Sequence, residues 1–364
     1  MNRTDPKSNA PIMMLSAGNG FIMQSEKYSR DNAGQSLKKY ILLKQGELAY
    51  NHGASKAKQF GCCYELTEPE ARIPYVYHCF KINDHEYTPF IAMALNNAKM
   101  DKQLKRLVSS SVRMDGLLNI SFEDYMSVTL HLPSSTEQKH IADFLKKIDE
   151  RIAAQEKLLA SLKKYKRGLL MHYFSDDKTQ LWTQCSVSQI GKVITGSTPP
   201  TNDRSNYDGD LLFCAPGDVG EQKYISSTEK RVSPKGFALG RPLPPNSVIV
   251  TCIGLIGKIG IAKTSMITNQ QINALVVSEG FDHEFIYYAF ENFFPEYRSK
   301  VSMQTLPILS KSEFEKLMIK VPDLDVQHKI SSHLAAMDRR IEHTQQELNA
   351  LIEHRRGIMQ QLFI

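Results

Sequence analysis

The sequence predicts an α+β protein built as an internal pseudo-two-fold repeat, in which two α/β domains each lead into one of two long antiparallel coiled-coil helices. Three observations predict this fold. The stretch Leu132–Phe174 recurs without a gap as Val321–Phe363. Each copy has the apolar spacing of a coiled coil, and the segments before the two copies match each other in order. A repeat of this length makes the chain two copies of one plan.

The two long stretches align so that equivalent residues lie 189 positions apart. Pro133 aligns with Pro322, and Gln138 aligns with Gln327. Each proline ends the preceding segment, because proline suits the first turn of a helix better than its interior. The alignment therefore predicts one long helix at the end of each copy.

Both predicted helices have two apolar positions per seven residues, which is the seam of a coiled coil. The seams are interrupted at the same places, where Gln155 matches Thr344 and Lys166 matches Arg355. Because the seams and their polar breaks match, we expect the two helices to pack antiparallel within one chain. The expected seam consists of Ile141, Leu145, Ile148, Ile152, Leu159, Leu162, Ile330, Leu334, Met337, Ile341, Leu348 and Leu351.

The repeat divides the chain into a first α/β domain at 1–131, a first long helix at 132–174, a second α/β domain at 175–320 and a second long helix at 321–364. In the first domain, Arg72–Ile82 reads as one half-buried strand and Pro89–Val108 as one helix. In the second, the glycines of GLIGKIG predict a tight hairpin. Nothing before Pro11 matches Trp182–Gly209, so the first domain lacks the opening segment of the second.

The composition is that of an ordinary folded protein. The 364 residues are 41% hydrophobic and 23% charged, with a net charge of +6. The six cysteines form no CxxC pair, and no apolar run reaches the ~20 residues of a membrane span. We therefore expect reduced cysteines, no membrane segment and a cytoplasmic location. Mild basicity is compatible with nucleic acid without demonstrating it.

The sequence predicts neither a catalytic site nor a metal site. GLIGKIG has too few residues between its glycines for a Walker A loop, and Ile259 follows Lys258 where Ser or Thr is needed. The 11 histidines are scattered and form no metal-ligand spacing. We expect no cofactor in this chain.

The twice-used α/β unit, closed each time by a helix with the pattern Q-x-x-I…L…D…R-I…L…L…R-G…F, resembles the specificity subunit of type I restriction–modification enzymes. The stretches ITGSTPP, FCAPGDVG, LPPNSVIVTCIGLIGKIGIA and TNQQINALVV are similar to a target recognition domain of that family. The resemblance covers nearly the whole chain. The missing opening segment of the first domain is its one departure.

The resemblance implies that each recognition domain reads one half of a bipartite site on double-stranded DNA, while the helix pair holds the domains apart. It implies two methyltransferase subunits, which supply S-adenosylmethionine chemistry, and a motor-nuclease subunit, which uses ATP and Mg. Two similar but unlike domains on a rigid spacer also suit the reading of two unlike half-sites, because half-site spacing follows protein geometry.

DNA contacts are expected in polar and glycine-rich loops, because Asn, Gln, Arg and Lys pair with base edges and Lys also serves phosphate. The candidates are Asn51, His52, Ser55, Lys56 and Lys58 in the first domain, and Thr195, Ser197, Thr198, Arg204, Lys223, Lys258, Asn269 and Gln270 in the second. Ordinary loop solvation is the alternative for each of them. The alternative functions are a coiled-coil scaffold that binds protein and, less favoured, a nucleotide-using enzyme built on the glycine hairpin.

Overall fold

The computed structural model describes residues 4–5, 7–27, 34–55, 58–108, 118–220, 222–300 and 307–363. The chain divides into two compact units. Unit 1 comprises Met1–Glu156 with Gln346–Ile364, and unit 2 comprises Lys157–Gln345. Each unit therefore holds one α/β domain together with half of each long helix.

Unit 1 contains three small antiparallel sheets, with strand orders β1-β2, β3-β6 and β5-β4-β7. Its strands are β1 (Met13–Ser16), β2 (Gly20–Met23), β3 (Ile41–Lys44), β4 (Leu48–Asn51), β5 (Cys62–Glu65), β6 (Glu70–Ile73) and β7 (His78–Phe80). Its short helices are α1 (Gln24–Lys27), the 3-10 helix η1 (Gly34–Lys39), α2 (Thr88–Ala94), α3 (Ala98–Leu107) and α4 (Phe122–Met126). The stretch Arg72–Ile82, predicted as one strand, is instead two strands, because Pro74 opens a turn between them.

The predicted single helix Pro89–Val108 is also wrong, because it is broken between α2 and α3. Asn97 is the N-cap of α3, and its side chain accepts hydrogen bonds from the backbone N–H groups of Lys99 and Met100. Asparagine competes with the helix for backbone partners and therefore favours caps. At the same break, the Asn96 side chain bonds both backbone groups of Cys63 on β5. The break thus connects the helical layer to the edge of a sheet.

Unit 2 contains a five-stranded sheet of order β11-β14-β13-β16-β9, a three-stranded sheet β12-β10-β15 and a two-stranded sheet β17-β8. Its strands are β8 (Thr183–Ser186), β9 (Gly191–Thr195), β10 (Tyr207–Cys214), β11 (Tyr224–Ile225), β12 (Lys230–Val232), β13 (Val248–Thr251), β14 (Ile259–Ala262), β15 (Met266–Thr268), β16 (Ile272–Val277) and β17 (Met318–Val321). Its short helices are α6 (Asp176–Thr179), α7 (Val187–Ile190), η2 (Arg204–Asn206), η3 (Pro216–Asp218), α8 (Pro234–Leu239), α9 (His283–Lys300) and α10 (Lys311–Lys316).

The glycine-rich stretch forms the predicted hairpin between β13 and β14, which pair antiparallel. Gly257 has a φ of +78°, and a Cβ atom there would lie 2.6 Å from the ring of Phe294 on α9. Glycine is needed here both for the left-handed backbone and for the close approach of the helix. The hairpin therefore packs directly against α9.

The repeat extends to the start of the short helices that precede each long helix. Ser121 and Asp124 form a capping box at α4, and the equivalent Ser310 and Glu313 form one at α10. In a capping box the two side chains satisfy each other's free backbone N–H groups. The two units therefore begin these helices by the same chemistry.

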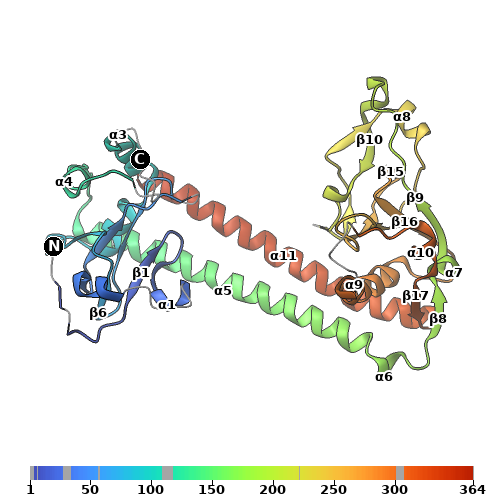
Figure 1. Cartoon of the computed structure of the whole chain (residues 1–364), viewed down its shortest axis with the longest axis horizontal. Helices are drawn as coiled ribbons and strands as arrows, with labels where there is room; N and C mark the ends of the chain where they lie inside the picture. Colours follow the sequence, from blue (N-terminus) through green and yellow to red (C-terminus); the bar gives the residue numbers. More distant parts are fainter. Residues whose placement is uncertain are drawn as a thin grey trace. The chain divides into compact units, whose positions relative to one another are not determined.

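The two long helices are α5 (Ser135–Tyr173) and α11 (Leu324–Leu362), and they run antiparallel in both units (Figure 1). In unit 1, Gln155 on α5 bonds Glu347 on α11. Asp149, which is earlier on α5, bonds Arg355, which is later on α11, so the two helices run in opposite directions. In unit 2, Lys166 pairs with Asp338 and Tyr173 with His333 in the same sense. The predicted antiparallel helix pair is confirmed.

The predicted seam residues are all buried or half-buried along both helices. Leu145 and Leu334 are completely buried. In unit 2 the α11 half of the seam joins the main core, where Ile330 and Leu334 pack with the aromatic face of α9. Burial of that face fixes α9 against α11 (Figure 1). Among the described residues, no helix is both long and apolar enough to span a membrane.

Candidate nucleic-acid interface

Two segments of unit 2, at the ends of β9 and β15, meet and form what we call the polar loop cluster, made of Thr195–Thr198 and Asn269–Gln271 with the Arg241 side chain. The backbone N–H of Ser197 donates to Thr268 O at 2.8 Å, and that of Asn269 donates to Cys214 O at 3.0 Å. A Cβ atom on Gly196 would lie 2.2 Å from Asn269 O, so only glycine allows the loops to meet this closely. The cluster is a rigid platform.

Side chains of the polar loop cluster form one exposed hydrogen-bonded pair and one that reaches a buried residue. The Thr198 hydroxyl donates to Gln270 Oε1 at 2.6 Å, and both residues are exposed. The Thr195 hydroxyl donates to Asn273 Oδ1 at 2.6 Å. With its oxygen occupied, the Gln270 amide presents its two N–H donors to solvent. The cluster therefore offers hydrogen-bond donors whose positions are fixed.

Arg241 belongs to this cluster although the sequence reasoning did not select it. Its guanidinium donates to Thr195 O at 2.8 Å, and the side chain is exposed. Arg241 is 46 residues from Thr195 in the sequence, so no local pattern indicates that the two residues meet. Of the other predicted cations, Arg204 is exposed on η2, and the half-buried Lys258 runs along Gly220.

Lys223 lies in a different place from the other predicted residues. Its side chain is 11% exposed and pairs with Glu284 at 2.9 Å. It also donates to the Tyr288 hydroxyl at 3.0 Å and lies 4.5 Å from the centre of that ring. Burial opposes ionisation of Glu284, but hydrogen bonds from Tyr224 and Lys223 hold its pKa below the ordinary value. Lys223 is thus held against α9 by a structural ion pair.

The predicted loop of unit 1 is only partly accessible. His52 is buried, and its Nδ1 lies 2.9 Å from Leu118 O. Asn51 ends β4 and accepts from Gly53 N at 2.9 Å, and the ammonium of Lys58 donates to Asn96 O at 3.1 Å. The half-buried Ser55 accepts from Lys58 N. Lys56 lies outside the described residues. The structure thus brings Asn51, Ser55 and Lys58 into one folded loop.

The polar break at Lys166 and its equivalent at Arg355 hold equivalent ion pairs. Lys166 lies 2.7 Å from Asp338 and 2.9 Å from Glu291 on α9. At the equivalent place in unit 1, Arg355 pairs with Asp149. In unit 2, Glu291 on α9 is a second carboxylate partner of Lys166. In unit 1, the break between α2 and α3 takes the place of that part of α9. The pair in unit 1 is therefore more open to solvent.

The equivalent glutamines Gln138 and Gln327 join each long helix to its own domain. Each donates through Nε2 to the carbonyl of the proline five residues earlier, Pro133 or Pro322. Each accepts through Oε1 from the backbone N–H before a helix, at 3.0 Å from Tyr87 and at 2.8 Å from Asp282. Both glutamines are buried. They satisfy helix-terminal donors that would otherwise be orphaned.

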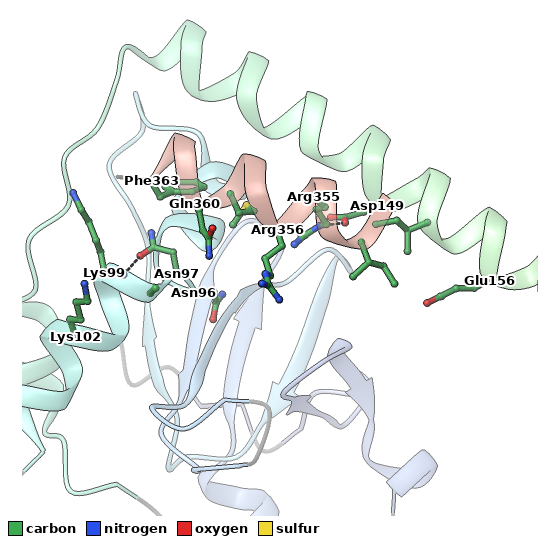
Figure 2. A pocket seen from close by; sticks show the side chains of 14 residues that line it. Asn96, Asn97, Lys99, Lys102, Asp149, Glu156, Arg355, Arg356, Gln360 and Phe363 are labelled. Atoms are coloured by element: carbon green, nitrogen blue, oxygen red, sulfur yellow. Dashed lines mark hydrogen bonds and ion pairs between the residues drawn. The ribbon is translucent and has the colours of Figure 1, made fainter. Parts of the chain in front are cut away.

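An apolar groove of about 750 Å³ lies in unit 1 between the start of α3 and the two long helices. Figure 2 shows Asn97 capping α3 on one side and the Arg355–Asp149 pair on the other. Lys99, Lys102 and Arg356 line it as well. Within the described residues, no cluster of His, Cys, Asp or Glu could hold a metal ion.

These features define a class of architecture, two α/β domains that are each joined to one of two paired long helices by an equivalent buried glutamine. The chain belongs to the family described as "Type I restriction modification DNA specificity domain", whose model matches residues 43–164 and 180–354. Each matched range lies within one copy of the repeat, and the resemblance stated from the sequence is confirmed.

Two curated relatives are similar to parts of the chain. The Type I restriction enzyme MjaIX specificity subunit of Methanocaldococcus jannaschii is 30% identical over 178 residues, which is 47% of this chain and 41% of the relative. The HindI specificity subunit of Haemophilus influenzae is 29% identical over 108 residues, which is 29% of this chain and 24% of the relative. The matched region thus spans less than half of either relative.

Solved structures match over nearly the full length. A chain from "Structural basis underlying complex assembly and conformational transition of the type I R-M system" has a TM-score of 0.59 and 16% identity, covering 100% of this chain and 94% of that chain. A type I restriction–modification S subunit from M. genitalium has a TM-score of 0.60 and 14% identity, covering 99% and 90%. At these identities the likeness shows the fold.

Proposed function

We propose that this chain is the non-catalytic DNA-recognition subunit of a type I restriction–modification complex, in which each domain reads one half of a bipartite target. The observation that carries the proposal is the match of the specificity-domain family to both copies of the repeat. The polar loop cluster supplies the chemistry, because exposed amide and guanidinium donors on a rigid platform are suited to base edges.

In the second domain, we assign direct base reading to Gln270, Arg241 and Thr198. Thr198 donates to the Gln270 oxygen, which leaves the two N–H groups of the amide to donate to a base. Donors match the O6 and N7 acceptors of guanine or the O4 acceptor of thymine in the major groove. Arg204 and Lys258 are suited to phosphate, whereas the backbone N–H groups of Ser197 and Asn269 already donate to backbone carbonyls of unit 2. The structural pairing of Lys223 argues against such a role for it.

In the first domain, the loop containing Asn51, Ser55, Lys56 and Lys58 takes the corresponding part. His52 is buried under this loop and serves to shape it. The loops of the two domains differ in nearly every side chain, so the two half-sites differ in sequence. Alanine at both Lys56 and Lys58 will flatten the salt dependence of binding by roughly one unit of slope per lost phosphate contact.

The partners follow from the same proposal. The helix pair sets the spacing of the half-sites and docks two methyltransferase subunits, one beside each domain, because equivalent joints offer equivalent surfaces. The methyltransferase partners carry S-adenosylmethionine, and the motor-nuclease partner carries ATP and Mg. Binding of the isolated chain to duplex DNA will be weak, because a net charge of +6 neutralises few phosphates.

The decisive experiment maps methylated adenines in DNA from cells that express this chain with its methyltransferase subunit. A bipartite, asymmetric motif with an unread spacer supports the proposal. Gln270→Ala with Arg241→Ala will relax the sequence only in the half-site of the second domain. Lys178→Ala on α6 is the matched control, since it removes an exposed charge outside the cluster. Absence of methylation would favour the scaffold alternative.

A further inference from the structure

The five-stranded sheet of unit 2 brings the glycine hairpin and the polar loop cluster to the same end. Strands β9 and β13 both pair antiparallel with β16, and their registers show that both end where β16 begins. The segment after β9, the segment before β16 and the hairpin after β13 therefore leave the sheet together. The backbone N–H of Cys252 donates to Gln271 O at 2.8 Å, which joins the start of the hairpin to the cluster.

Two large apolar side chains are exposed at this end of the sheet. Leu255 in the hairpin and Ile308 beside it are each 60% exposed, and we call these two residues the apolar tip. An antiparallel bridge between Ile253 and Ile308 holds the second residue next to the hairpin. A single exposed leucine is ordinary on a protein surface, but here two such residues adjoin a cluster of fixed hydrogen-bond donors.

Hydrogen bonds fix the backbone of the hairpin around Leu255. The Thr251 hydroxyl donates to Leu255 O at 2.5 Å and accepts from Lys258 N at 3.0 Å. The guanidinium of Arg298 on α9 donates to the next two carbonyls along the chain, at 3.2 Å and 3.0 Å. Because this backbone is already ordered, an apolar contact made by Leu255 loses little of its free energy to ordering the loop.

An apolar side chain next to fixed donors matches one base edge in the major groove of DNA. Thymine presents its C5-methyl group there, beside the O4 acceptor of the same base. Gln270 is exposed and offers N–H donors, and Lys258, which follows Leu255 in the same hairpin, offers a cation to phosphate. The loop at the equivalent place in the first domain, residues 51–60, contains neither leucine nor isoleucine. The apolar tip is therefore a property of the second domain.

We propose that Leu255 recognises the C5-methyl group of a thymine in the half-site of the second domain, with Ile308 extending the apolar contact. The inference rests on the proposed function, and it adds recognition by apolar contact to the hydrogen-bonding residues already assigned. A thymine is available wherever the proposed complex methylates an adenine, because the two bases are paired in the duplex.

The test measures binding of the chain, together with its methyltransferase subunit, to synthetic duplexes that carry the mapped target, by fluorescence anisotropy. The half-site of the second domain is the one that Gln270→Ala with Arg241→Ala relaxes. Deoxyuridine replaces each thymine of that half-site in turn, which removes only the methyl group and keeps the base pairing. We expect one replacement to weaken binding roughly fourfold, as the loss of one buried methyl group would. Leu255→Ala will abolish this difference between thymine and uracil, whereas Leu255→Met will retain it.

Leu181→Ala, at a position 98% exposed before β8, is the matched control and will leave the difference between thymine and uracil unchanged. A difference that persists in Leu255→Ala, or no difference at any thymine of this half-site, overturns the inference and leaves the proposed function standing. Equal weakening of both duplexes by Leu255→Ala also overturns it, because Leu255 would then contact another part of the DNA or the partner subunit. Failure of the complex to bind the unmodified duplex would overturn the proposed function, and this inference with it.

Discussion

The equivalent ion pairs at Lys166 and Arg355 predict unequal losses when each cation is replaced by methionine. Lys166 is 12% exposed, and its partners Asp338 and Glu291 are 23% and 32% exposed. Arg355 and Asp149 are 33% and 44% exposed. Removing one partner of a buried pair leaves an uncompensated charge and costs about 3 kcal/mol or more. An exposed pair contributes about 1 kcal/mol or less.

Lys166→Met will therefore lower the melting temperature of unit 2 by roughly 6–12 °C, given ~2–4 °C per kcal/mol for a unit of this size. Trp182 lies in unit 2, so its fluorescence reports the unfolding of that unit in urea. Arg355→Met will change the circular dichroism melt by a few degrees at most. Adding Glu291→Gln to Lys166→Met will recover part of the loss, because two carboxylates no longer face each other.

The pH dependence gives a second reading of the same pair. Burial raises the pKa of Glu291 above its ordinary value even with Lys166 present. A carboxyl whose pKa is raised in the folded state is favoured below its unfolded pKa, and that contribution disappears as the pH rises through the folded pKa. The defect of Lys166→Met will thus be smaller at about pH 5 than at pH 7. Two results would refute the argument that burial makes the two ion pairs unequal. One is an equal loss of stability in Arg355→Met and Lys166→Met, and the other is a loss in Lys166→Met that grows as the pH falls.

Three further predictions concern stability and reactivity. Leu145→Asp, at a fully buried seam position, will lower the free energy of unfolding by several kcal/mol, whereas Asp at the neighbouring Phe144, 52% exposed, will have little effect in the same urea titration. Gln327→Ala will cost about 1–3 kcal/mol, because the part-buried backbone N–H of Asp282 at the start of α9 loses its acceptor. An unchanged melting temperature would show that this hydrogen bond does not hold α11 to its domain. Burial raises the pKa of the Cys63 thiol to about 12, while Cys185 is only partly buried. Iodoacetamide at neutral pH will therefore label Cys185 first, as peptide mapping will show.

The repeat and the helix pair could be predicted because they follow from local periodicity. The seam residues are spaced by the helix itself, so their burial needs no knowledge of the domains. The break at Asn97 has a local signal, because asparagine favours N-caps, but the apolar pattern of Pro89–Val108 continues through it and predicts one helix. What ends α2 is the bonding of Asn96 to a strand far away in the sequence.

The candidate DNA-contacting residues were only partly predictable, for a related reason. Polar composition identifies a loop, but it does not say which way a side chain points. Lys223 looks like a surface cation in the sequence, yet the neighbouring carboxylate of Glu284 and three tyrosine rings hold it inside. Arg241 joins the polar loop cluster only through a hydrogen bond to Thr195, 46 residues away. Such contacts depend on tertiary structure.

The bond between Asn96 and Cys63 has a consequence for solubility. Strand β5 is at the edge of its sheet, and free backbone groups on such an edge can recruit a strand from another molecule. One amide side chain covers both the N–H and the C=O of Cys63, as a neighbouring strand would. Asn96→Leu would keep the size of the side chain and uncover that edge. Light scattering during refolding would then report growing aggregates, even where the native melt is little changed.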